Sequence, residues 1–205
     1  MATRGTDPGP PEVAHRSRGE LTLTERARRA QLIDVTIEQV AERGYAGATL
    51  AGIAERAGIT KAAIIYHFPS KDALVRAAYE HVLTELTGEV AAAVEAAAAA
   101  DAPAAYVRSM VGHLRQHPRH TRMIIEAMGP GGNDHAPQTR WRPLAEIITA
   151  AQSALGTTGE DPRTSAIIIG GAIDAIVAER LHDPDYDTAA AAEQLVRMIS
   201  AMLAA

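Results

Sequence analysis

The chain has 205 residues, of which 47% are hydrophobic, 22% are charged and only 3% are aromatic. This length is enough for one large domain or two small ones, and the absence of cysteine excludes disulfides, thiolate metal sites and cysteine nucleophiles. There is no apolar run of 18 residues and no signal-peptide core, so we expect a cytoplasmic protein.

The formal net charge of −5 is unevenly divided along the chain. Residues 1–82 carry eleven Lys and Arg against ten Asp and Glu, whereas residues 83–205 carry nine against fifteen. The acidity therefore lies in the C-terminal part, and contacts with phosphate by the N-terminal part are not excluded. A core that must be built from Ala, Ile, Leu, Val and Met favours helices over sheets. Since the sequence shows no alternation of apolar and polar residues typical of strands, we predict an all-α protein of about nine helices.

Residues 1–20 are rich in proline, glycine and charge and cannot bury a core, so they predict a disordered tail. The alternative is that Arg16 and Arg18 reach a minor groove of DNA, as the N-terminal arms of other DNA-binding domains do.

The first helix is predicted to begin after Thr22, with Glu25 completing a capping box. Gly44 is expected to end it. We expect Tyr45, the next residue, to pack back into the core.

Two short helices follow, at residues 50–57 and 61–67. Thr49 and Thr60 are good N-caps for them, and Gly58 stands where a left-handed C-cap is needed. Two short helices joined by a tight glycine turn are typical of a helix-turn-helix, whose second helix lies in the major groove. The alternative is an ordinary corner between two helices of a bundle.

Side chains on the two faces of this pair agree with DNA binding. The inward face is apolar, with Ile53, Ala54, Ala57, Ile59 and Ile64. On the outward side, small Ala62 and Ala63 would let the backbone approach base edges. The residues predicted to contact DNA, mostly at phosphates, are Thr49, Thr60, Lys61, Ala62, Ala63, Tyr66, His67 and Lys71. Lys71 follows Ser70 at the start of the next helix, where free amides favour phosphate.

Residues 24–80 resemble the tetracycline-repressor-like (TetR) family of bacterial transcription regulators. The landmarks that carry the resemblance are Ala41 to Tyr45, Thr49, Ile53-Ala54, Ala57 to Lys61, Tyr66 to Phe68 and Ser70 to Leu74. Ile65 departs from the pattern where an aromatic residue is frequent, and Val40 where Phe is common. The resemblance implies a three-helix DNA-binding domain at 21–70 and a helical ligand-binding and dimerisation domain at 71–205.

A long helix is predicted from Lys71 toward Ala100, joining the two domains as a lever, before Pro103 interrupts it. Five further helices are expected at 104–117, 119–128, 138–155, 162–181 and 187–204, with an exposed loop at 129–137. The resemblance implies that the last two helices pair with their copies in a dimer. The residues predicted for this interface are Ile169, Gly170, Ile173, Leu195, Ile199 and Met202. The alternative is that these residues form an intramolecular core.

Large or soft side chains of the second domain are candidates for an apolar ligand pocket. They are Tyr106, Met110, His113, Met123, Met128, Trp141, Leu144 and Ile147. At helical spacing such residues are also found in a plain core.

Three histidines, His113, His117 and His120, stand close together in the sequence. A metal cluster would need a further ligand, and no carboxylate lies at ligand spacing nearby, while Pro118 breaks the helix. We therefore predict no metal site and no cofactor.

These features together predict a sequence-specific DNA-binding transcriptional regulator, a homodimer on a near-palindromic double-stranded operator. We expect a repressor released by an unknown small-molecule effector. A regulator without a ligand, or an activator, is the alternative. An α-helical enzyme is a more remote one, because the nucleophile-elbow, zinc-protease, P-loop and dinucleotide motifs are absent.

Overall fold

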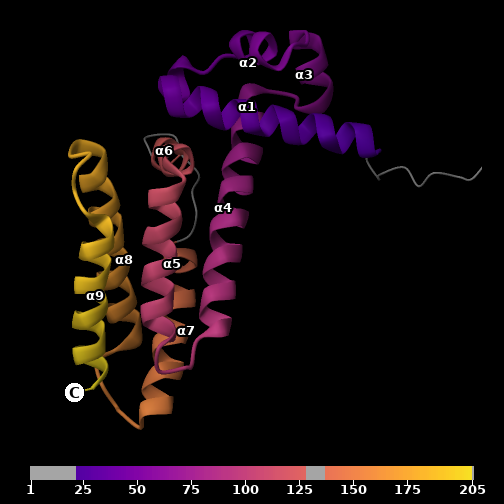
Figure 1. The fold of residues 1–205 in the computed structure, drawn as a ribbon. Coiled ribbons are helices and arrows are strands. Elements are labelled where there is room, and N and C mark those ends of the chain that lie inside the picture. The colour runs from indigo at the N-terminus through magenta and orange to yellow at the C-terminus, as the bar shows by residue number, and fades with distance from the viewer. Residues whose placement is uncertain (1–21, 128–136, 205) are drawn as a thin grey trace, which may run out of the picture.

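The computed structural model describes residues 22–127 and 137–204, and these stretches form nine helices and no strand (Figure 1). The predicted all-α fold is therefore confirmed. The helices are α1 (Leu23–Gly47), α2 (Leu50–Ala57), α3 (Lys61–His67), α4 (Lys71–Ala96), α5 (Ala102–Gln116), α6 (Pro118–Ala127), α7 (Pro137–Leu155), α8 (Pro162–His182) and α9 (Thr188–Leu203). Predictions for the tail at 1–20, with Arg16 and Arg18, for Met128 and for the loop up to 136 lie outside the described residues.

Helices α1, α2 and α3 form a cap across one end of a helical bundle (Figure 1). Helix α4 leaves this cap and runs along the bundle, where it packs against α5, while α8 and α9 lie on the side away from α4. Helix α6 lies against α1, at the junction between the cap and the bundle. No helix of the described stretches is both long enough and apolar enough to cross a membrane.

Local signals in the sequence set the helix boundaries in the cap. The Thr22 hydroxyl accepts from the Glu25 N–H and the Glu25 carboxylate accepts from the Thr22 N–H, so the predicted capping box is present. Gly44 has a φ of 69°, which interrupts α1 just where an end was expected, although one more helical turn runs on to Gly47. Gly58 has a φ of 66° and forms the left-handed C-cap of α2. These are conformations that glycine adopts at little cost.

Tyr45 is not a core residue, contrary to the prediction. The break at Gly44 takes its ring off the buried face of α1, and the residue is 39% exposed. Its hydroxyl donates to the Asp72 carboxylate at the start of α4, and its N–H donates to Glu126 of α6 at 2.9 Å. Tyr45 therefore ties the cap to the bundle from the surface.

The buried side chains form three clusters. One holds α2 and α3 on α1, and its members are Leu32, Ile53, Ala54, Ala57, Ile64, Phe68 and Leu74. A second, with Ile37, Val40, Val82 and Met123 among its members, joins α1 to α4 and α6. The third fills the bundle between α5, α7, α8 and α9. Helix α4 contributes side chains to the first two clusters. Because these clusters are close-packed, a change in the tilt of α4 must shift the helices of the cap.

Candidate nucleic-acid interface

Helix α3 lies on the surface of the cap with one side buried and the other open to solvent. Ile64 is fully buried and Phe68 is 2% exposed, so these two residues anchor the helix. On the other side Lys61 and Ala62 are exposed, and Tyr66 is 74% exposed. The predicted helix-turn-helix is confirmed in its helix bounds and caps, and contact with DNA stays a prediction.

Helix α1 fixes α3 from below. The Arg29 guanidinium donates to the carbonyl of His67 and lies 4.0 Å from the centre of the Phe68 ring. The Gln31 side-chain amide donates to the Ala57 carbonyl at 3.4 Å. The Arg29 side chain is therefore engaged in holding α3 on α1, and we do not count it among the residues that contact phosphate.

The predicted threonine contacts are N-caps in the structure. The Thr49 hydroxyl accepts from the Gly52 N–H and the Thr60 hydroxyl accepts from the Ala63 N–H, each at 3.1 Å. A hydroxyl that accepts in this way still has its own proton to donate, so both remain able to bind a phosphate oxygen. Lys61 is exposed and forms no ion pair within the described residues, which leaves its ammonium available.

Two of the predicted contact residues already have partners. The Lys71 ammonium donates to the Tyr45 carbonyl at 2.5 Å and lies 4.2 Å from the centre of the Tyr45 ring. The Tyr66 hydroxyl donates to Glu25 at 3.1 Å. The pKa of Glu25 is lowered, first by the hydrogen bond from the Thr22 backbone, so its charge persists beside α3. These partners make Lys71 and Tyr66 weaker candidates for phosphate contact than Lys61.

His67 is half-buried at the end of α3, edge-on to Tyr66 with 5.0 Å between ring centres. Ala63 is also half-buried. The open surface of α3 thus consists of Lys61, Ala62, Ile65 and Tyr66, of which Ile65 is 41% and Tyr66 74% exposed.

A network of ion pairs that the sequence did not predict holds α2 against α1 and α6. Arg56 of α2 donates two hydrogen bonds to Glu42, each 3.0 Å long, and this lowers the pKa of Glu42. Glu38, one turn earlier on α1, accepts from Arg119 of α6 at 2.9 Å. In the sequence, the only sign of this network is the pair of glutamates four residues apart on α1. Both arginines come from other helices, so their part in it could not be seen.

The predicted ligand-pocket residues are spread over two places. Tyr106, Met110, Trp141 and Leu144 belong to the bundle core or pack against it. Met123 does not join them: it is fully buried in the cluster between α1, α4 and α6. Ile147 is half-buried on α7, and His113 is buried beside α4. A pocket formed by all of these residues stays a prediction.

Most of the predicted dimer residues are buried inside a single protomer. Ile169, Ile173, Leu195 and Ile199 are each at most 8% exposed and belong to the bundle core, as the alternative of an intramolecular core proposes. Gly170 and Met202 are half-buried.

Other apolar residues of α8 and α9 face solvent. Ile167 and Ile168 of α8 are 50% and 65% exposed, and Met198 of α9 is 63% exposed. Residues 166–173 of α8 are apolar nearly all round, so this helix can bury one face and still present another.

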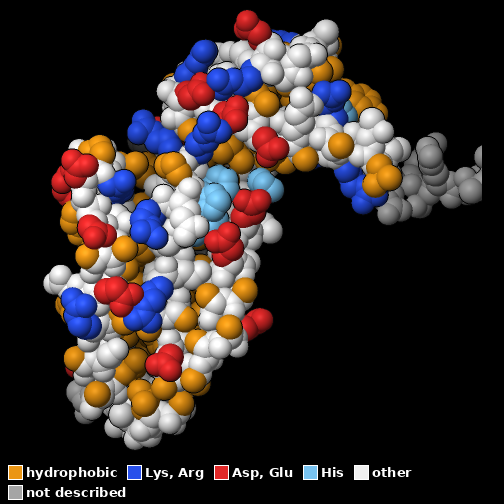
Figure 2. All heavy atoms as spheres, in the orientation of Figure 1, with side chains coloured by type: hydrophobic (Ala, Val, Ile, Leu, Met, Phe, Trp, Pro, Cys, Tyr) orange, Lys and Arg blue, Asp and Glu red, His pale blue; other side chains and the backbone are white. Residues whose placement is uncertain are grey.

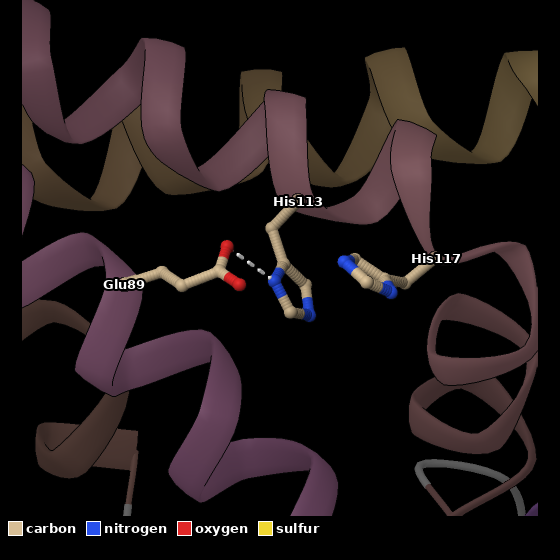
Figure 3. A group of neighbouring side chains, drawn as sticks. All are labelled: Glu89, His113 and His117. Carbon is tan, nitrogen blue, oxygen red and sulfur yellow. Dashed lines mark hydrogen bonds and ion pairs between the residues drawn. The ribbon is translucent and has the colours of Figure 1, made fainter.

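The histidines of α5 and α6 have carboxylate neighbours in space, although no carboxylate stands at ligand spacing near them in the sequence. Glu89 of α4 lies 2.7 Å from His113 (Figure 3). Ligand atoms of Glu89, His113 and His117 all lie within 4.8 Å of one another. The carboxylate is 24 residues away in the sequence and is brought close only by the packing of α4 on α5.

Known structures share the fold of this chain. A TetR-like transcriptional regulator from Rhodococcus sp. RHA1 matches with a TM-score of 0.69 over 84% of this chain and 93% of its own, at 18% identity. The transcriptional regulator FadR from Bacillus subtilis, solved in complex with stearoyl-CoA, matches with a TM-score of 0.71 over 83% and 97%, at 19% identity. At these identities the likeness shows the fold alone.

Sequence relatives match part of the chain. The HTH-type transcriptional regulator BetI of Burkholderia thailandensis is 45% identical over 84 residues, which are 41% of this chain and 42% of that regulator. The chain thus matches about two fifths of the length of such curated relatives. Residues 32–78 match the family model described as bacterial regulatory proteins, tetR family. Over this helix-turn-helix segment, the chain is similar to the tetR family of bacterial regulatory proteins.

Proposed function

We propose that this protein is a sequence-specific DNA-binding transcriptional regulator, and not an enzyme. The observation that carries the proposal is the exposed outer face of α3 above a fully buried Ile64. Ala62 on that face has no bulk to hold the backbone away from base edges, and Lys61 and Thr60 flank it with donors for phosphate. Such a regulator would act in the cytoplasm, where a bacterial chromosome lies.

We propose a homodimer as the binding unit. A single short recognition helix buries too little surface for specific binding, whereas two can enter successive major grooves about 34–36 Å apart. The exposed Ile168 and Met198 of α8 and α9 support an interface on these helices. A two-fold axis through that interface would require a near-palindromic operator.

We further propose that residues 21–70 act as the DNA-binding domain and residues 71–205 as the effector-binding and dimerisation domain, with release from the operator on ligand binding. Helix α4 supports this division of labour, because Leu74 packs in the cluster of the cap and Val90 is buried farther along the same helix. The same-fold FadR of B. subtilis, solved in complex with stearoyl-CoA, supports a small-molecule effector. Coupling needs only a ligand that favours one tilt of α4 over another.

The experiment is selection of binding sites from a random duplex library by the full chain, followed by anisotropy titration of the selected duplex. We expect two inverted half-sites whose centres are one helical turn apart. Ala62→Glu should abolish binding, since a carboxylate would then face the phosphates. Ala91→Glu, at an exposed position of α4, is the matched control and should bind normally. Recovery of no preferred sequence would overturn the proposal.

The titration also separates repression by a ligand from its alternatives. A metabolite that weakens operator binding supports a repressor released by its effector. A metabolite that strengthens binding, or none that changes it across a broad panel, supports the activator or ligand-independent alternatives instead.

A further inference from the structure

Histidines and glutamates gather where α4, α5 and α6 meet, directly beneath the cap. Figure 2 shows the histidine side chains as a patch beside acidic ones on the concave face below α1. The residues concerned are His81, Glu85 and Glu89 of α4, His113 and His117 at the end of α5, and His120 of α6. The resemblance to regulators and the DNA interface account for none of them.

His113 is held in one orientation by Glu89. The His113 side chain is fully buried, and its Nδ1 lies 2.7 Å from the Glu89 carboxylate (Figure 3). A carboxylate can only accept, so Nδ1 of His113 donates in this hydrogen bond. The other ring nitrogen, Nε2, is then left with a lone pair. Metal-ligating histidines are commonly oriented in this way, by a carboxylate on the nitrogen that does not bind the metal.

The lone pair of His113 points to a second imidazole. Its Nε2 lies 3.3 Å from Nδ1 of His120. Two nitrogens bound to one tetrahedral zinc, at about 2.0–2.1 Å each, stand about 3.3–3.4 Å apart. The spacing of the two rings therefore already fits a shared ion, which would replace the single proton that joins the nitrogens now.

His117 completes the set from the C-terminus of α5. Its ring centre lies 4.4 Å from that of His113 and 4.9 Å from that of His120. Ligand atoms of Glu89, His113 and His117 lie within 4.8 Å of one another, and His120 reaches the same His113 ring from α6. The His117 and His120 rings are stacked, so one of them must rotate for all three rings to reach one ion.

We propose that His113, His117 and His120, with Glu89 positioning His113, bind one divalent transition-metal ion, for which zinc is the type case. Three imidazoles with an open fourth position are a known zinc arrangement. Imidazole also suits copper and nickel, whereas magnesium and calcium prefer oxygen ligands. The proposed selectivity is therefore for zinc-like ions over magnesium.

The position of the site gives metal binding a consequence for the cap. Glu89 belongs to α4, whereas His120 belongs to α6, which contacts α1 through Met123 and through the Glu126–Tyr45 hydrogen bond. An ion held here would fix the tilt of α4 against α5 and α6. This coupling to DNA rests on the proposed function, whereas metal binding itself does not.

Calorimetric titration of the full chain with zinc tests the site, using protein without an affinity tag after treatment with a chelator. We expect one zinc per chain with a Kd in the micromolar range or tighter, and no such binding of magnesium. The informative variant is His117→Gln, since within the described residues His117 makes ring contacts but no side-chain hydrogen bond. It should keep the fold and weaken zinc binding at least tenfold, as should Glu89→Gln.

His182→Gln is the matched control, because His182 is exposed on α8 and, among residues 22–127 and 137–204, its side chain bonds only to a carbonyl of its own helix. It should bind zinc like the unaltered protein. Absence of stoichiometric zinc binding, or equal affinity of His117→Gln and His182→Gln, would overturn the site.

A parallel titration of operator DNA with and without zinc tests the coupling. A change in operator affinity that His117→Gln abolishes supports it, and unchanged affinity with zinc bound refutes the coupling while leaving the site intact. If the chain binds zinc but recognises no DNA sequence, the proposed function fails and the metal site stands.

Discussion

Replacing Lys61 with alanine isolates one proposed phosphate contact. Lys61 is the first residue of α3, it is exposed, and among the described residues it has no ion-pair partner whose loss would confuse the result. The variant should therefore fold normally and differ only in DNA binding. Arg142→Ala is the matched control, because Arg142 is 71% exposed on α7 and, within the part of the chain that the structure describes, pairs only with Glu146 of its own helix.

The size of the effect follows from counterion release. Each neutralised phosphate contributes about 0.9 to the slope of log Kobs against log salt concentration. A dimer carries two copies of Lys61, so the slope should become shallower by about 1.8. For proteins that bind equally at about 1 M salt, this corresponds to about 60-fold weaker binding at 0.1 M and about 20-fold at 0.2 M.

Anisotropy titrations of the selected operator at several salt concentrations measure this slope. Lys71→Ala should change the slope less than half as much, because the Lys71 ammonium already donates to the Tyr45 carbonyl. A slope for Lys61→Ala equal to that of the unaltered protein would refute the phosphate contact. An equal loss in Arg142→Ala would show that overall charge, rather than the position of Lys61, decides affinity.

Three further changes test the packing under α3, the charge of the N-cap residue of α8, and the dimer. Ile64→Ala removes a fully buried side chain under α3 and should lower the free energy of unfolding by about 2–5 kcal/mol in urea titrations; a loss near zero would contradict the packing. Hydrogen bonds from Thr164 lower the pKa of Asp161, so its charge stabilises the fold above its unfolded pKa of about 3.9, and this is lost as the pH falls through the lowered value. Asp161→Asn should thus be less stable than the unaltered protein at pH 7 and equal to it at the acid end of a pH series; a constant difference would exclude the ionic contribution. Ile168→Glu with Met198→Glu places charges on the exposed faces of α8 and α9 and should give monomers in sedimentation velocity; a persistent dimer would locate the interface elsewhere.

The cap could be predicted from the sequence because its signals are local. Thr49, Gly58 and Thr60 each act on backbone groups within a few residues, and the structure has each in its predicted role. The apolar spacing of the cap likewise predicted burial of Ile53 and Ile64. Capping and helical periodicity depend on near neighbours, so the order of residues is enough to reveal them.

The contacts between residues of different helices were decided only by the tertiary structure. The sequence determined that α8 and α9 are apolar, but only packing assigned Ile169 to the core of the protomer and Ile168 to its surface. It showed three histidines but not Glu89, which reaches His113 from another helix. Lys71, likewise, finds the Tyr45 carbonyl only because α1 breaks at Gly44 and turns toward α4. Such partners are distant along the chain, and their meeting depends on how whole helices pack, which no local pattern records.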